Sequence, residues 1–150
     1  MIYKQIEIDR KADYRQTLTL RTDVLRRPLG LVLSEEDTAE DREGIMVGAF
    51  DEDVLKAFAL LVPRSDSGMQ MRYVCVASRD QGKGIGRALV EYAETTALCE
   101  GYTEIRLLAR QSAEGFYFRL GYRPFGDLFT LRGLPHLHMK KELKTTHEMI

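Results

Sequence analysis

The chain of 150 residues is 44% apolar and 30% charged, a balance that is typical of one folded domain and excludes a disordered or collagen-like chain. Its formal net charge of −1 argues against nucleic acid and membrane surfaces as partners, and no apolar run is long enough to span a bilayer. Its two cysteines, Cys75 and Cys99, lack the spacing of a disulfide framework or a metal site, and its first residues do not resemble a secretory signal. We therefore expect one cytoplasmic domain over residues 1–150, with no metal ion.

The first half of the chain predicts a strand, a helix and three hairpin-linked strands. A weakly periodic apolar pattern indicates a strand at residues 2–8. Near-helical spacing of leucines and a valine predicts a helix from about Asp9 to Leu25, ended by Pro28 and Gly30. Three β-like runs separated by short polar turns follow, which predicts an antiparallel meander. These runs are residues 44–50, 54–62 and 69–76.

Two charged stretches in this half are interpreted as solvated surface. Arg26 and Arg27 follow the predicted helix and suit its negative pole, so we expect exposed side chains and not a substrate clamp. Residues 34–41 read Ser-Glu-Glu-Asp-Thr-Ala-Glu-Asp and have no apolar face. They predict a mobile, solvated loop, and a lid that attracts a cationic amine is the alternative.

The second half of the chain predicts a parallel crossover followed by a second helix and two strands. Residues 85–101 place apolar side chains on one helical face, and residues 104–109 follow as a strand. A strand, a crossover helix and a strand in this order favour parallel pairing. Ser112 is a candidate N-cap for a helix that ends at Gly121. The last two strands, residues 122–125 and 137–143, flank a turn at residues 133–135, and the whole order predicts an α/β domain with a mixed sheet.

A glycine-rich turn joins strand 69–76 to helix 85–101, with glycines at the alternate positions 82, 84 and 86. Without side chains in the way, successive backbone N–H groups can converge on an anion at the helix N-terminus. The dinucleotide fingerprint fails because Arg87 or Leu89 stands where its third glycine is required. The phosphate loop of nucleotide hydrolases fails because Gly84 follows Lys83 and Ala77 replaces the earlier glycine. The turn predicts a different phosphate-bearing ligand, with close strand-to-helix packing as the alternative.

The same turn matches the pattern Q/R-x-x-G-x-G/A over residues 81–86, five residues after Val76. It resembles the acyl-CoA-binding signature of the GNAT superfamily of N-acyltransferases. The resemblance implies that the turn amides hold the pyrophosphate of coenzyme A. It also implies that the sheet splays after Val76, so that the pantetheine arm pairs with strand backbone while the Cys75 side chain faces the opposite side. The residues expected to bind acetyl-CoA are Val74, Cys75, Val76, Gln81, Gly82, Lys83, Gly84, Ile85, Gly86, Arg87, Arg110 and Ala113.

A second segment resembles the family's pattern A-x-x-F-Y-x-x-x-G-F/Y. The matching residues are Ala113, Phe116, Tyr117, Gly121 and Tyr122. By this resemblance the Tyr117 hydroxyl lies near the thioester sulfur and donates a proton to the departing thiolate, worth about 10²-fold in rate. A core aromatic is the alternative role for Tyr117. Many family members carry Asn where Arg110 stands, so Arg110 either replaces that contact through its own donors or the contact is lost.

The closing segment adds a narrower resemblance. Residues 133–141 resemble the ending G-I-P-H-x-x-M-x-K of a bacterial subgroup of the same family, and residues 21–31 also fit that subgroup's first helix. The resemblance then touches nearly the whole chain, apart from residues 34–41 and the tail after Lys144.

Family resemblance implies direct attack of an amine on acetyl-CoA, with a strand amide polarising the carbonyl. An alkyl amine is mostly protonated at neutral pH, and strand 69–76 lacks the Glu that many family members use to take its proton. His136 is one candidate base, with a structural turn histidine as the alternative. The acids Glu35, Glu36 and those of residues 51–53 are further candidates. A water chain, or an amine of lower pKa, would need no base.

The sequence thus predicts an acetyl-CoA-dependent N-acetyltransferase that acts on an amine of a small molecule or a peptide. A non-catalytic acyl-CoA-binding or sensing module with the same fold is the alternative. No feature of the sequence identifies the acceptor, and a homodimer is an open alternative to a monomer.

Overall fold

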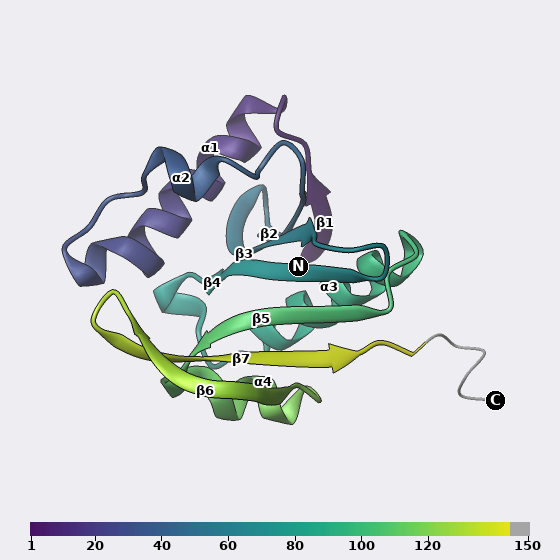
Figure 1. The fold of residues 1–150 in the computed structure, drawn as a ribbon. Helices are drawn as coiled ribbons and strands as arrows, with labels where there is room; N and C mark the ends of the chain where they lie inside the picture. Colours follow the sequence, from purple (N-terminus) through teal and green to yellow (C-terminus); the bar gives the residue numbers. More distant parts are fainter. Residues whose placement is uncertain (145–150) are drawn as a thin grey trace.

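The computed structural model describes residues 1–144, which form a seven-stranded sheet in the order β1-β2-β3-β4-β5-β7-β6 (Figure 1). Neighbouring strands are antiparallel except for β4 and β5, which are parallel as predicted. The strands are β1 (Ile2–Ile6), β2 (Ile45–Asp51), β3 (Val54–Pro63), β4 (Gly68–Val76), β5 (Glu104–Arg110), β6 (Arg123–Leu131) and β7 (Leu134–Glu142). The α-helices are α1 (Lys11–Arg21), α2 (Glu35–Thr38), α3 (Ile85–Cys99) and α4 (Glu114–Arg119). The predicted α/β class with a mixed sheet is therefore confirmed.

The sheet has a hydrophobic core on each face, because successive residues of a strand point to opposite sides. In β3, Ala57, Ala59 and Leu61 pack into the core that includes the apolar face of α3. Phe58 and Leu60 pack into the second core, which includes Leu20 of α1. Helices α1 and α3 thus cover opposite faces of the β2–β4 region (Figure 1). No helix among residues 1–144 has both the length and the apolar character of a membrane-crossing segment.

Several predicted boundaries differ from the structure. The first helix continues beyond Arg21 as a π-helical segment, Thr22–Arg26, and then a 3-10 turn, Arg27–Leu29. The prediction that Ser112 caps the second helix is wrong, because a 3-10 turn over Gln111–Ala113 precedes α4 and no side chain caps it. The last hairpin turns at Arg132 and Gly133, both with positive φ, so Leu134 and Pro135 belong to β7. Paired positive φ values suit the right-handed twist of the two strands.

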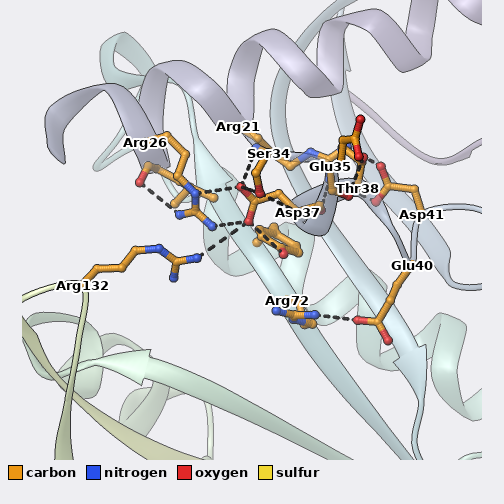
Figure 2. Close-up of polar contacts among 12 residues, drawn as sticks. Arg21, Arg26, Ser34, Glu35, Asp37, Thr38, Glu40, Asp41, Arg72 and Arg132 are labelled. Carbon is orange, nitrogen blue, oxygen red and sulfur yellow. Dashed lines mark hydrogen bonds and ion pairs between the residues drawn. The ribbon is translucent and has the colours of Figure 1, made fainter. Parts of the chain in front are cut away.

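The acidic stretch 34–41 is not a solvated loop, and this prediction is wrong. Its centre is the short helix α2, closed by a capping box in which Ser34 N donates to Asp37 Oδ2 at 2.9 Å and Asp37 N donates to Ser34 Oγ at 3.3 Å. The side chains of Asp37 and Asp41 are buried. Each is paired with an arginine from the preceding helical segments, as Figure 2 shows.

The prediction that the Arg26 side chain is exposed is wrong. Its guanidinium is buried and forms a two-point pair with Asp37, Nε–Oδ2 at 3.1 Å and Nη2–Oδ1 at 2.7 Å. Burial opposes ionisation of Asp37, but the hydrogen bonds from Arg26 and Ser34 outweigh it and hold the pKa of Asp37 well below its usual range. Arg27 is exposed, as predicted, and its one ion-pair partner within residues 1–144 is Asp23 of the preceding turn.

Candidate active site

The candidate site begins where strands β4 and β5 part. Their parallel pairing runs from Gly68–Glu104 to Met71–Leu107 and stops there, although β4 continues to Val76 (Figure 1). The sheet therefore opens five residues earlier than the predicted point after Val76. Among the described strands, β4 from Arg72 onward pairs only with β3, so one edge of its backbone is available to a ligand.

A bulge in β4 marks the opening. The β3–β4 register shifts between Phe58 and Leu60, so that Tyr73 and Val74 together oppose Ala59. Tyr73 has a φ of 57°, an unfavourable backbone conformation for a tyrosine. Its hydroxyl donates to Asp37 Oδ1 at 3.2 Å, which ties the bulge to α2. A bulge turns the strand and re-aims its side chains, which is the geometry expected next to a binding site.

One cavity of about 500 Å³ fills the opening between β4 and β5, and we call it the arginine cavity. Its walls come from the π-helical segment, the bulge, the end of β5 and the tip of the β6–β7 hairpin. The arginines that line it are Arg26, Arg72, Arg110 and Arg132. Its volume lies in the range of small-molecule sites.

A second cavity, of about 520 Å³, follows the glycine turn, and we call it the glycine groove. Gly82 and Gly84 have φ values of 80° and 84°, and a Cβ at either position would meet no atom within 4 Å. Backbone conformation, and not crowding, therefore selects glycine at these two positions. Gly84 is the N-cap of α3 and supplies no side-chain cap, so the first amides of α3 are left for a ligand.

Gly86 and Gln81 fix the position of the glycine turn relative to β4 and α4. A Cβ on Gly86 would lie 3.2 Å from Cγ2 of Val76 and 3.5 Å from Cζ of Phe116, so glycine allows α3 to approach β4 and α4 closely. The Gln81 side chain donates from Nε2 to the backbone oxygen of Val76 at 3.1 Å, which fixes the turn to the end of the strand. The two sequence signatures therefore meet in one place.

Most of the residues expected to bind acetyl-CoA line the glycine groove. These are Val74, Cys75, Val76, Gln81, Gly82, Gly84, Gly86, Arg87 and Ala113. Lys83 does not line it, because its ammonium lies 3.3 Å from Asp80 Oδ1 and its side chain is mainly exposed. Ile85 is buried in the core, and Cys75 is buried on the α1 side, where burial raises the pKa of its thiol to about 12. Arg110 lies in the arginine cavity and not in the groove.

Tyr117 lies where the two cavities meet, since it lines both. Helix α4 presents it to the core, and its ring packs edge-on against Phe116 and Tyr122 at centroid distances of 5.0 and 5.8 Å. Within residues 1–144 its hydroxyl has no hydrogen-bond partner. Burial raises the pKa of this hydroxyl above its usual value near 10. Tyr117 is therefore both a core aromatic and a protonated donor beside both cavities.

His136 lines the arginine cavity from β7, where it pairs with Arg110 of β5. Its Nδ1 lies 2.9 Å from the backbone oxygen of Leu134, and a carbonyl only accepts, so Nδ1 carries the proton. In the neutral ring, Nε2 then holds the free lone pair. The other candidate bases are not brought to either cavity: Glu35, Glu36 and residues 51–53 are exposed elsewhere.

The sequence interpretation missed the arginine partners of the acidic stretch, of which Arg26 and Arg72 line the arginine cavity. Arg21 and Asp41 form a fully buried pair at 2.8 Å, and Glu40 holds Arg64 and Arg72 together. The spacing of Ser34 and Asp37 was a usable signal, because Ser-x-x-acid is the pattern of a capping box. No comparable local pattern marks the arginine partners.

Comparisons with known proteins agree with this geometry. A family model described as "Acetyltransferase (GNAT) domain" matches residues 32–143. A Bacillus subtilis (strain 168) protein assigned as an acetyltransferase, BSU40680, is 30% identical over 73 residues. That match spans 49% of this chain and 50% of the relative's length.

Solved structures extend the likeness to nearly the whole chain. A Lactobacillus plantarum protein assigned as an N-acetyltransferase superposes with a TM-score of 0.80 at 26% identity, covering 96% of this chain and 100% of that one. An aminoglycoside 6'-N-acetyltransferase solved with coenzyme A shares the fold with a TM-score of 0.83 at 23% identity, covering 97% and 98% of the two chains. The chain therefore belongs to the GNAT family of acetyltransferases, the family indicated by its two sequence signatures.

Proposed function

We propose that this protein transfers the acetyl group of acetyl-CoA to a primary amine of a small molecule or a peptide. The observation that carries the proposal is the position of Tyr117, which lines both the glycine groove and the arginine cavity. A thioester reaching from the groove and an amine entering from the cavity would meet beside its hydroxyl.

The residues of the groove suit coenzyme A. The first backbone amides of α3, which follow Gly84 in the chain, would bind the pyrophosphate. A helix N-terminus combines free N–H donors with a favourable dipole. Arg87 lines the groove and would add a cation, since its exposed pair with Glu91 engages only Nε, at 3.0 Å, among residues 1–144. The pantetheine arm would pair with β4 at Val74 and Val76, along the edge that β5 leaves open.

The reaction needs two proton movements. The amine nitrogen attacks the thioester carbonyl, the C–N bond forms, and the C–S bond breaks with its electron pair on sulfur. His136 would take the amine proton at Nε2, since Nδ1 is committed to Leu134. Tyr117 would give its proton to the thiolate, and its raised pKa keeps that proton in place beforehand. The phenolate would regain a proton from solvent, and His136 would lose its extra proton to solvent, before the next turnover.

The substitution Tyr117→Phe tests this assignment. We expect kcat to fall about 10²-fold while affinity for coenzyme A stays within about twofold, because only the hydroxyl is removed and the ring packing is kept. Thiol release measures kcat, and calorimetry measures coenzyme A binding. Tyr92→Phe is the matched control, since Tyr92 packs against the same core and lines neither cavity. An unchanged kcat for Tyr117→Phe would leave Tyr117 with a packing role only.

The pH profile gives a separate prediction. For a peptide α-amine of pKa about 8, kcat/KM should rise with pH up to about 8 and then stay level to about pH 10. The rise reflects the neutral amine. The plateau follows because the donor must be protonated, and burial raises the pKa of Tyr117 above 10, so it does not lose its proton in this range. A descending limb between pH 8 and 10, after correction for uncatalysed hydrolysis, contradicts the role of Tyr117 as donor.

A further inference from the structure

We infer that the acceptor amine carries an anionic group, a carboxylate or a phosphate ester, which binds Arg110 and Arg132 in the arginine cavity. This inference rests on the proposed acetyl transfer and names the class of acceptor. It starts from the charges on the cavity wall. Four arginines and His136 line this cavity, and among residues 1–144 no aspartate or glutamate lines it.

Two of the four arginines already have carboxylate partners. Arg26 is paired at two points with Asp37, and Arg72 donates to Glu40, whose pKa is lowered by its hydrogen bonds from Arg64 and Arg72. These two guanidinium groups shape the wall, but their charge is largely compensated. They are therefore poor candidates for holding a ligand.

Arg110 has no carboxylate partner among residues 1–144, and Arg132 has only a distant one that it shares with Arg26. The one hydrogen bond that the structure gives the Arg110 side chain is a long one, 3.4 Å from Nη2 to the backbone oxygen of Leu25, and no carboxylate of residues 1–144 lies within ion-pair distance of it. Arg132 lies at the tip of the β6–β7 hairpin and points toward Asp37, as Figure 2 shows. Its Nη2 is 3.9 Å from Asp37 Oδ1. That oxygen already accepts from Arg26 at 2.7 Å and from Tyr73 at 3.2 Å. Each guanidinium thus retains N–H donors for an incoming anion.

The position of Arg110 links the anion to the chemistry. It lies at the end of β5, directly opposite His136 in the β5–β7 pairing, and both line the cavity that Tyr117 borders. An anionic group bound at Arg110 would therefore place the rest of the acceptor in the space that leads to Tyr117. The cavity of about 500 Å³ accommodates a small amine with a second functional group.

The same charges disfavour a polycationic acceptor. Aminoglycosides carry several ammonium groups, and a wall of arginines without a carboxylate would repel them. The aminoglycoside acetyltransferase with the similar fold therefore does not predict the acceptor of this chain. An acceptor with an amine and an acid satisfies the cavity better.

Matched pairs of acceptors test the inference. Glycyl-leucine and glycyl-leucinamide have similar α-amines and differ in one carboxylate, and O-phosphoethanolamine and ethanolamine differ in a phosphate. We expect the anionic member of at least one pair to be preferred about 10- to 100-fold, the contribution of charge-assisted hydrogen bonds. The pair with the larger preference distinguishes carboxylate from phosphate ester. Turnover is followed by thiol release, and binding by calorimetry on protein saturated with coenzyme A.

Variants connect the preference to the two arginines. Arg110→Gln and Arg132→Gln should each reduce the preference about tenfold or more, and Arg110→Lys should retain part of it. Arg27→Gln is the matched control, because it removes one positive charge from an exposed arginine that lines neither cavity. An anionic preference that persists in Arg110→Gln and Arg132→Gln overturns the assignment.

The binding measurement separates this inference from the proposed function. Tighter binding of the anionic member without thiol release supports the anion site and contradicts acetyl transfer to that class of amine. Equal binding of the two members of both pairs, or no binding of any, overturns the anion site, whether or not acetyl transfer to other amines is found.

Discussion

Asp41→Asn is expected to lower the free energy of unfolding by about 3–5 kcal/mol, the usual cost of leaving one partner of a buried ion pair alone. Asp41 and Arg21 are both fully buried and meet at two points, Nη2–Oδ2 at 2.8 Å and Nη1–Oδ1 at 3.1 Å. Tyr14 also donates to Asp41 Oδ2, at 2.6 Å. The amide keeps the size of the side chain but not its charge, so the Arg21 guanidinium loses the group that compensates its burial.

Urea unfolding followed by circular dichroism measures this loss, provided that the slope with denaturant stays constant. Asp9→Asn is the matched control: Asp9 is 85% exposed and lies 3.7 Å from Arg42, so its loss should change stability by less than about 0.5 kcal/mol. The double variant Arg21→Met/Asp41→Leu should recover much of the stability, because it removes both charges together. A loss of only about 1 kcal/mol in Asp41→Asn would mean that water or a rearranged side chain reaches Arg21.

Local patterns in the sequence predicted the elements that local physics determines. Helix α3 has a continuous apolar face and a glycine-rich start, so the helix and the turn before it were both visible from residue types alone. The parallel pairing of β4 with β5 followed from the strand-helix-strand order. The boundaries of the first helix were less accurate, because the π-helical segment after Arg21 has no signature in the sequence.

The buried charges could not be predicted in the same way, since their partners are distant in the chain. Asp37 and Asp41 follow Arg26 and Arg21 by 11 and 20 residues, and a run of acids looks alike whether it is solvated or paired. The bulge at Tyr73 depends on the register against β3, so residues 69–76 looked like an ordinary strand. These two features set the wall and the opening of the arginine cavity, which is why the acceptor side of the site was the part that the sequence left undefined.

The glycine turn carries the second large expected effect, because Gly84→Asp should weaken coenzyme A binding about 10²- to 10³-fold. Gly84 directly precedes the first amides of α3, so an aspartate would place a carboxylate beside the proposed pyrophosphate site. Two like charges about 4 Å apart in a partly solvated site repel by about 4 kcal/mol. The predicted loss follows from that repulsion, together with competition of the carboxylate for the helix amides.

Backbone strain must be separated from charge in this experiment. Gly84 has a φ of 84°, and any side chain there costs about 1–2 kcal/mol in stability. Gly126→Asp is a matched control, because Gly126 has a φ of 77°, an equally open Cβ position and no place in either cavity. Gly84→Asn adds a second control with nearly the same shape as aspartate and no charge. We expect all three variants to lose similar stability, measured by thermal unfolding without ligand.

Calorimetric titration with coenzyme A then distinguishes the two causes. Gly126→Asp should bind like the unmodified protein, Gly84→Asn should bind with an intermediate affinity, and Gly84→Asp should bind most weakly. The difference between the two Gly84 variants should shrink at high salt, since exposed charge repulsion is screened over about 10 Å at 0.1 M ionic strength. Equal affinities of Gly84→Asp and Gly126→Asp would place the pyrophosphate away from the start of α3. The open edge of β4 beyond Met71 would then have to bind coenzyme A without the helix.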